Sequence, residues 1–468
     1  MIYSSILYLI LLIVFGVFCL LKKKTNINFK IIFYVLEGIL FTSMFVKCFM
    51  HDSFIYVIND GELYGVYSNN TDIKESFIRW VMMFSQIIFL NLAINNNKFN
   101  KILSAYICLP LVFISSLFFD NSLSYFLNYE HVLAFRFPNV LIIIILYLEM
   151  LSSLLIPITL LFYNKDELKI EQKHDYAVLV KLGIFSLLTC IPFLFYPSLF
   201  GQSEIQIKFM NTTHIMWIVS IALIYCLFYF CFQNEDISIR ESILTVLILY
   251  LFFHFNSCFK VGLTLWRLPF QLCNLASYLF VIIMVCKKQS LFNFLFVANP
   301  VGALIAIITL SETGPIFKYW IIHYLIEHLW VFIIPLLFIS FKIFKIPNIK
   351  QLTKSYFIWF SIYYFSMLFL NVFINGVLVP NFGSTIINSV NYFYLLDCPV
   401  KDVLPFYKDL MIGHIKIFNV DLYIVYLLFI YVVFTALCYL LYFIQVLFFK
   451  LAIYLKNQSA KILFHKQH

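Results

Sequence analysis

Long runs of apolar residues restrict the fold of this chain more than any other feature. Residues 3–21 carry no charged side chain, and residues 138–163 carry only that of Glu149. Apolar runs of about 18 residues or more are typical of membrane-spanning helices. The sequence is 63% hydrophobic and 12% charged, which excludes an ordinary water-soluble domain. Because the runs lack the alternating polarity of barrel strands, they predict an all-α polytopic membrane protein.

We predict about thirteen transmembrane helices, joined by short polar connections and two longer loops. The predicted spans are residues 3–21, 31–49, 80–96, 102–119, 138–163, 178–200, 214–232, 242–259, 269–286, 290–310, 319–341, 355–379 and 421–449. The loop at residues 50–79 is acidic. The loop at residues 380–420 contains an aromatic stretch, NYFYL, that we expect to lie along the membrane interface.

The distribution of lysine and arginine predicts the orientation in the membrane. Lys22, Lys23 and Lys24 follow the first span and no basic residue precedes it, the reverse of a signal peptide. The positive-inside rule places these lysines, Lys287 with Lys288, and the C-terminal lysines on one side. We therefore expect a plasma-membrane protein with its N-terminus outside and its C-terminus cytoplasmic. The net charge of +9 follows from this topology and does not indicate nucleic-acid binding.

A weak internal repeat suggests how the spans are grouped. Residues 137–162 resemble residues 316–341, because in each segment a glutamate, Glu149 or Glu327, is followed at the same spacing by an Ile-Pro pair. The alternative is chance similarity between two hydrophobic sequences. A parallel repeat predicts three parts: an N-terminal anchor at 1–30, a degenerate six-helix half at 31–235, and a second six-helix half at 236–468.

Polar residues of the second half gather at one predicted depth in the membrane. The topology places Cys273 and His323 about one helical turn below the outer surface. Six other polar or aromatic residues lie near this level: His254, Trp266, Arg267, Gln271, Asn371 and Asn375. Glu327 lies one turn below His323 and could orient it. Strongly polar groups inside spans are costly, so they mark a candidate site.

Each of these residues also has a purely structural interpretation. A buried cysteine behaves as a small hydrophobic residue, and a membrane histidine such as His254 or His328 often bonds a backbone carbonyl. Trp266 and Arg267 are what an aromatic belt and a snorkelling side chain would supply. The eleven cysteines lie mostly in hydrophobic runs, which argues against a disulfide framework, although Cys258 and Cys398 could face the same side and pair.

The functional interpretation is nucleophilic catalysis on a lipid ester. A cysteine thiolate beside a histidine can attack a carbonyl carbon and hold the acyl group as a thioester. His323 would take the thiol proton of Cys273, and Arg267 or Lys260 could hold a lipid phosphate. Membrane lipids are therefore the expected partners.

Four short motifs in the second half carry a family resemblance. They are Leu268-Pro269-Phe270-Gln271-Leu272-Cys273, the pair Gly302-Ala303, the stretch FKYWIIH ending at His323, and Asn391-Tyr392, with Asn371 before the last loop. This order and spacing resemble the YwaF-like and transmembrane protein 164 family of integral membrane proteins. The resemblance implies a six-helix core and, from the eukaryotic relative, a phospholipid acyltransferase with Cys273 as acyl carrier and His323 as base. Gln271 departs from the histidine that bacterial members often carry there.

Other functions remain open at this point. A transporter or flippase would use Glu149 and Glu327 inside the membrane, and a non-catalytic scaffold would use neither these nor Cys273. A polyprenyl-dependent glycosyltransferase with a metal on Asp52, Asp60 or Glu62 ranks lowest, because such acids usually follow the first span directly. We find no phosphate-binding loop and no metal-spaced His/Cys cluster, so no cofactor is expected. The sequence does not set the oligomeric state.

Overall fold

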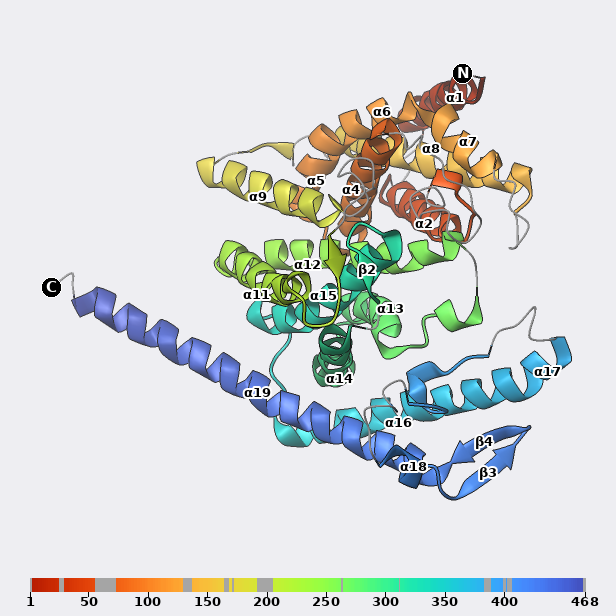
Figure 1. The fold of residues 1–468 in the computed structure, drawn as a ribbon. Helices are drawn as coiled ribbons and strands as arrows, with labels where there is room; N and C mark the ends of the chain where they lie inside the picture. Colours follow the sequence, from red (N-terminus) through yellow and green to blue (C-terminus); the bar gives the residue numbers. More distant parts are fainter. Residues whose placement is uncertain are drawn as a thin grey trace. The chain divides into compact units, whose positions relative to one another are not determined.

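The protein is almost entirely helical (Figure 1). The computed structural model describes residues 2–24, 29–54, 73–128, 137–163, 168–170, 172–191, 205–261, 264–310, 312–382, 389–398, 401 and 406–465. Among these residues, nine helices are long and apolar enough to cross a membrane, and two shorter apolar helices accompany them. The prediction of an all-α, multi-pass membrane protein is therefore confirmed, whereas the count of about thirteen spans stays a prediction.

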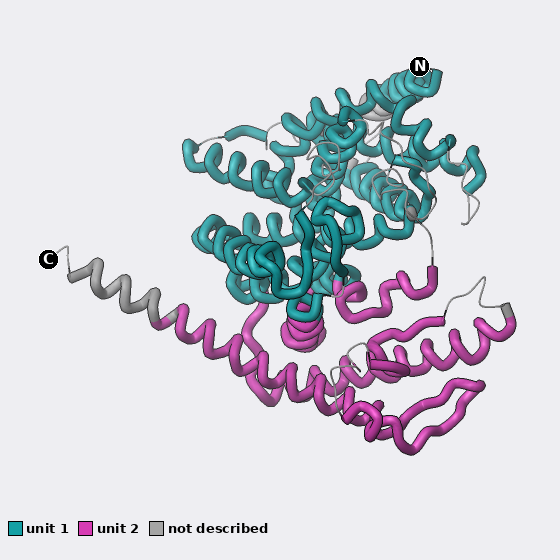
Figure 2. Tube along the Cα trace, in the orientation of Figure 1, with its two compact units in different colours: residues 1–263, 277–286, 306–343 teal, residues 264–276, 287–305, 344–468 magenta. Residues whose placement is uncertain are grey.

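The chain divides into two compact units (Figure 2), one at residues 1–263, 277–286 and 306–343 and the other at residues 264–276, 287–305 and 344–468. The first unit contains α1 (Ile2–Lys24), α2 (Phe29–Lys47), α4 (Ile73–Ile94), α5 (Lys98–Ile102), η1 (Leu103–Cys108), α6 (Leu109–Ser116), α7 (Phe119–Leu127), α8 (Asn139–Tyr163), α9 (Lys173–Thr189), β1 (Gln206–Ile207), α11 (Thr212–Phe232), α12 (Ile237–Asn256), η4 (Ser257–Val261), β2 (Gly314–Pro315) and α15 (Tyr319–Ser340). The second contains η5 (Leu265–Arg267), α16 (Ile349–Phe373), η6 (Ile374–Leu378), α17 (Val379–Phe382), η7 (Tyr392–Tyr394), α18 (Tyr407–Leu410), β3 (His414–Ile417), β4 (Val420–Tyr423) and α19 (Ile424–His465). Helices α13 (Leu272–Cys286) and α14 (Gln289–Thr309) contribute residues to both units. The three-part division into an anchor and two halves stays a prediction.

Helix α12 forms the core of the first unit. Every residue from Ser242 to Asn256 is buried, and the helix packs against α4, α9 and α15. Its sequence, SILTVLILYLFFHFN, is apolar around its whole circumference, which is typical of a helix enclosed by other helices.

An asparagine cluster between α4 and α5 fixes the start of α12. Asn95 Nδ2 donates to Thr245 Oγ1 at 2.6 Å, and Asn100 Nδ2 donates to Ser242 Oγ at 3.0 Å. Asn91 Nδ2 donates to the Ser242 carbonyl at 3.1 Å. Buried amides that lacked such partners would be costly in an apolar surrounding, so these bonds set the register of α12 against α4.

In the second unit, hydroxyl bonds and aromatic rings join α16 to α19. Tyr364 Oη donates to the Leu427 carbonyl at 2.8 Å, and Tyr439 Oη donates to Thr353 Oγ1 at 2.8 Å. The Phe360 and Phe434 rings stack with their centroids 5.2 Å apart. Tyrosine suits this role because its ring packs while its hydroxyl reaches a polar partner.

The loops and cysteines add detail to the sequence expectations. In the NYFYL stretch Tyr392 is 1% exposed and Phe393 is 8% exposed, whereas Tyr394 is 46% exposed, and its place at the membrane interface stays a prediction. Residues His414–Tyr423 form an antiparallel hairpin that the sequence analysis missed, with the turn residues Phe418 and Asn419 at positive φ. Cys258 and Cys398 are not joined in a disulfide, in agreement with the argument against a disulfide framework.

Gly376 in η6 lies directly against the hairpin turn. A Cβ at this position would overlap the backbone and side chain of Phe418. We expect Gly376→Ala to displace the hairpin and cost about 1–3 kcal/mol of stability, because an added methyl in a close-packed contact forces the backbone to shift. The measurement is the thermal unfolding midpoint in detergent. Gly38→Ala is the matched control: this helical glycine has nothing within 4 Å of a built Cβ, so that substitution should be neutral or slightly stabilising.

Candidate functional site

His323 lies in a buried aromatic cluster of the first unit. Its ring stacks on that of His254, with the centroids 4.7 Å apart and the planes at 22°. The rings of Tyr319 and Trp320 approach it at 5.8 Å and 5.9 Å. His254 Nε2 is 3.5 Å from the His323 carbonyl oxygen, and His254 Nδ1 is 3.2 Å from Tyr250 Oη. The structure therefore brings together two of the predicted site residues.

The helical spacing of α15 adds an acid to this cluster. Tyr319, His323 and Glu327 are four residues apart and share one face of the helix. Glu327 Oε2 is 3.9 Å from His323 Nε2, and Glu327 Oε1 has no hydrogen-bond partner among the described residues. An acid at this place can orient the imidazole and stabilise its protonated form. We call His254, His323 and Glu327 the histidine cluster.

His328, by contrast, has the structural role considered for it. Its Nδ1 is 2.7 Å from the Tyr324 carbonyl oxygen, one turn back on the same helix.

Cys273 lies in the first turn of α13, in the second unit. The thiol is not in a disulfide and is half-buried. A Cβ built on Gly302 of α14 would be 3.5 Å from Cys273 Sγ and 3.4 Å from Leu272 Cδ2. The Gly-Ala pair therefore lets α14 pass close to the thiol, and a side chain larger than alanine at Gly302 would press on it.

The three predicted amide residues hold one backbone segment in place. Asn371 binds both the N–H and the carbonyl of Tyr392, at 2.7 Å and 2.8 Å. Asn375 binds both backbone groups of Val390, at 2.8 Å and 2.7 Å. Gln271 accepts from the Phe393 N–H at 2.9 Å and donates to the Asn391 carbonyl at 3.1 Å. This arrangement positions the segment after α17 beside the start of α13.

Trp266 and Arg267 form the short helix η5 just before α13. The Arg267 guanidinium lies over the Trp266 ring, 5.0 Å from its centroid, and the Trp266 side chain is 51% exposed. A cation on an exposed tryptophan is compatible both with an interfacial anchor and with a lipid-phosphate contact.

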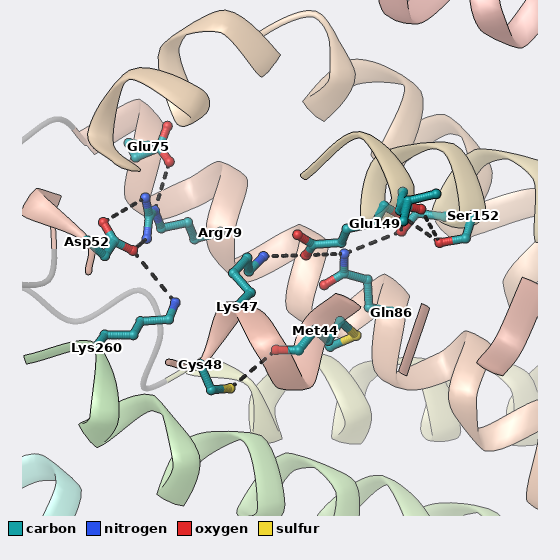
Figure 3. A network of polar contacts seen from close by, with 12 residues as sticks. Met44, Lys47, Cys48, Asp52, Glu75, Arg79, Gln86, Glu149, Ser152 and Lys260 are labelled. Carbon is teal, nitrogen blue, oxygen red and sulfur yellow. Dashed lines mark hydrogen bonds and ion pairs between the residues drawn. The ribbon is translucent and has the colours of Figure 1, made fainter. Parts of the chain in front are cut away.

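The structure also contains a charged network that the sequence analysis missed (Figure 3). Arg79 of α4 binds Asp52 through both terminal nitrogens and Glu75 through Nε. The Lys260 ammonium is 3.6 Å from Asp52 Oδ2. Asp52 thus forms ion pairs with both basic side chains. Burial alone would raise the pKa of Asp52, but the positive charges of Arg79 and Lys260 outweigh burial and lower it.

A second ion pair lies beside the first. Lys47 of α2 binds Glu149 of α8, which also accepts from Gln86 Nε2 at 2.8 Å. The sequence did contain a signal for this ion pair: Lys47 and Glu149 lie in two separate predicted spans, and buried charges in membranes require partners.

The lowest-ranked alternative in the sequence analysis placed a metal ion on Asp52, Asp60 or Glu62. Among the described residues, no group of three His, Cys, Asp or Glu side chains could hold a metal ion. Asp60 and Glu62 lie outside the described residues.

Comparison with known protein families finds a match that lies mainly in the second half of the chain. The model of the TMEM164 family matches residues 209–444. The chain belongs to the TMEM164 family. The matched region contains Cys273, His323 and Asn371, whereas Lys47, Asp52, Arg79 and Glu149 precede it. Neither the curated proteins nor the solved structures contain a match to this chain.

Asn371→Ala tests the positioning of the segment. We expect it to lose two buried hydrogen bonds and about 1–3 kcal/mol, and to increase amide exchange at Tyr392 and Phe393. The measurement is hydrogen–deuterium exchange by mass spectrometry. Asn381→Ala is the control, because its exposed side chain donates only to the Val377 carbonyl within its own turn. Equal exchange in the two variants would contradict the assigned role of Asn371.

Proposed function

We propose that this TMEM164-family protein is a phospholipid acyltransferase or lipid hydrolase that uses Cys273 as its nucleophile and His323 as its base. The observation that carries the proposal is the histidine cluster, in which Glu327 Oε2 lies 3.9 Å from His323 Nε2 and the His254 ring of α12 stacks on the His323 ring. A histidine oriented by an acid is the usual partner of a nucleophilic thiol.

The position of Cys273 supports its role as nucleophile. It is the second residue of α13, where the positive end of the helix dipole favours a thiolate. The thiol is half-buried, in contrast to buried cysteines such as Cys108 and Cys438.

The body of α13 lies near the histidine cluster within the first unit. Tyr278, five residues after Cys273, donates to Asn256 Oδ1. The Phe255 ring lies 6.3 Å from the Tyr278 ring and 6.3 Å from the His323 ring.

The proposed reaction has two steps. His323 takes the proton from Cys273, and the thiolate attacks the carbonyl carbon of a lipid ester. The ester C–O bond breaks, the leaving alkoxide takes the proton from His323, and the acyl group remains as a thioester. A second lipid alcohol, or water, then attacks the thioester and restores the thiol.

We further infer the arrangement in the membrane from the sequence pattern. About thirteen spans form the anchor at 1–30 and the halves at 31–235 and 236–468, in the plasma membrane, with the N-terminus outside. This orientation places Cys273 near the ester carbonyls of the outer leaflet.

Intact mass spectrometry tests the thioester. Wild-type protein supplied with phospholipid should gain the mass of one acyl chain, and neutral hydroxylamine should remove it. Cys273→Ser should show no hydroxylamine-sensitive adduct. Cys286→Ser, an exposed cysteine at the other end of the same helix, should behave as wild type. If the wild-type protein gains no adduct during turnover, the transporter, flippase or scaffold interpretation is favoured instead.

Substitution of the histidines tests the base. His323→Asn should slow adduct formation by about 10²–10⁴-fold, because proton transfer from the thiol loses its acceptor. His328→Asn removes a buried histidine one turn away that bonds a backbone carbonyl, and should leave the rate within a few-fold of wild type. Similar losses in both variants would assign the effect to helix packing rather than to proton transfer.

A further inference from the structure

A cavity in the first unit connects the charged network to the histidine cluster. It has a volume of about 120 Å³, enough for several atoms of a ligand or several waters. Lys47, Glu75, Arg79, Glu149 and Lys260 line one part, and His254 and Tyr319 line another. The two steps proposed for acyl transfer do not use the charged part, although the sequence analysis considered Lys260 beside Arg267 as a lipid-phosphate contact.

Two of the three basic side chains on this cavity are already well bonded. Arg79 has two carboxylates and lies over the Phe54 ring, 4.5 Å from its centroid. Lys47 binds Glu149 directly. Close, paired geometry of this kind is what makes a buried charge tolerable.

Lys260 is different. It is 8% exposed, and its nearest acidic oxygen, Asp52 Oδ2, is 3.6 Å away, beyond hydrogen-bond distance. Asp52 is engaged at shorter range by Arg79, as Figure 3 shows. An ammonium has three hydrogens to donate, so Lys260 retains unused donor capacity at the cavity wall.

The charges on the cavity surface favour an anion. The lining contains three basic side chains, Lys47, Arg79 and Lys260, and two acidic ones, Glu75 and Glu149. Asp52 is fully enclosed behind them and neutralises the cluster when the cavity is empty. An oxyanion at Lys260 would replace a long ion pair by a direct charge-assisted hydrogen bond.

Besides Gln86, Ser122 and Ser257, the rest of the wall is mostly apolar and adaptable. It is formed by Met82, Met83, Phe119, Leu123, Leu146 and Met150. Methionine side chains adjust to irregular apolar ligands. A bare inorganic anion would leave this wall without contacts.

We propose that this cavity binds one anionic amphiphile, with its oxyanion, a carboxylate or a phosphate, on Lys260 and the first carbons of its apolar tail against Met82, Met83 and Met150. The site belongs mainly to the part of the chain that precedes the family match. It is tested by binding alone, so it stands or falls independently of acyl transfer at Cys273.

Lys260→Met is the first test, with binding measured on the full-length protein in neutral detergent. Oleate or oleoyl-lysophosphatidate should bind wild type about 10–100-fold more tightly than the variant, which lacks the ammonium but keeps an apolar stem. Lys101→Met is the matched control, a lysine of the same unit that is 6% exposed and does not line the cavity. It should bind as wild type.

The choice of probe separates the sources of the anion. Binding of oleate alone supports a carboxylate head group, and binding of oleoyl-lysophosphatidate alone supports a phosphate. Equal binding of oleate and of oleoyl-lysophosphatidate by wild type and Lys260→Met, or equally tight binding of inorganic phosphate by wild type, overturns the proposal.

Two further variants keep the test decisive if Lys260→Met unfolds. Met82→Trp fills the cavity without changing its charge and should abolish binding of the amphiphile. Asp52→Asn removes the carboxylate that competes with the ligand and should tighten binding. Tighter binding of these anionic probes after Asp52→Asn supports an anion at Lys260, whereas unchanged or weaker binding overturns the proposal.

Discussion

The enclosure of α12 by its neighbours is the constraint on which the first unit depends. A helix that is apolar on every side gains its stability only when other helices cover it, so α4, α9 and α15 must pack around it. Its polar residues are confined to the two ends. Near its start, Ser242 and Thr245 bond asparagines of α4 and of the segment that ends in α5. Near its other end lies His254, and Lys260 follows in η4. One residue of the histidine cluster, His254, and one of the charged network, Lys260, therefore lie at or just beyond the same end of this buried helix.

Charges near this end are arranged in partnered groups, because an unpaired charge in an apolar medium is costly. Arg79 satisfies two carboxylates, and Lys47 satisfies the glutamate of α8. Against this background the looser contacts stand out. Among the described residues, the Lys260 ammonium has a long ion pair with Asp52 and lies over the Phe126 ring, 5.8 Å from its centroid, and Glu327 has one oxygen without a hydrogen-bond partner. Groups that the fold leaves incompletely bonded are the ones available to a ligand or to a reaction.

Part of the candidate site was predictable from the sequence. Helical spacing places Tyr319, His323 and Glu327 on one face of α15, and the short motifs single out Cys273 and the Gly302-Ala303 pair. The stacking of His254 on His323 could not be predicted, because it depends on how α12 and α15 pack. The same holds for Asn371, Asn375 and Gln271, whose amides bind a segment that the sequence analysis assigned to the membrane interface. The pairing of Cys273 with His323 stays a prediction.

The sequence by itself determined that the chain is helical and embedded in a membrane, because hydrophobicity and run length act locally and need no knowledge of neighbours. It also determined the family, through motifs that are contiguous in the chain. Only the tertiary structure decided which charges pair, because Lys47 with Glu149 and Asp52 with Arg79 and Lys260 come from separate helices. Contacts between side chains far apart in sequence depend on helix packing, which no local pattern specifies.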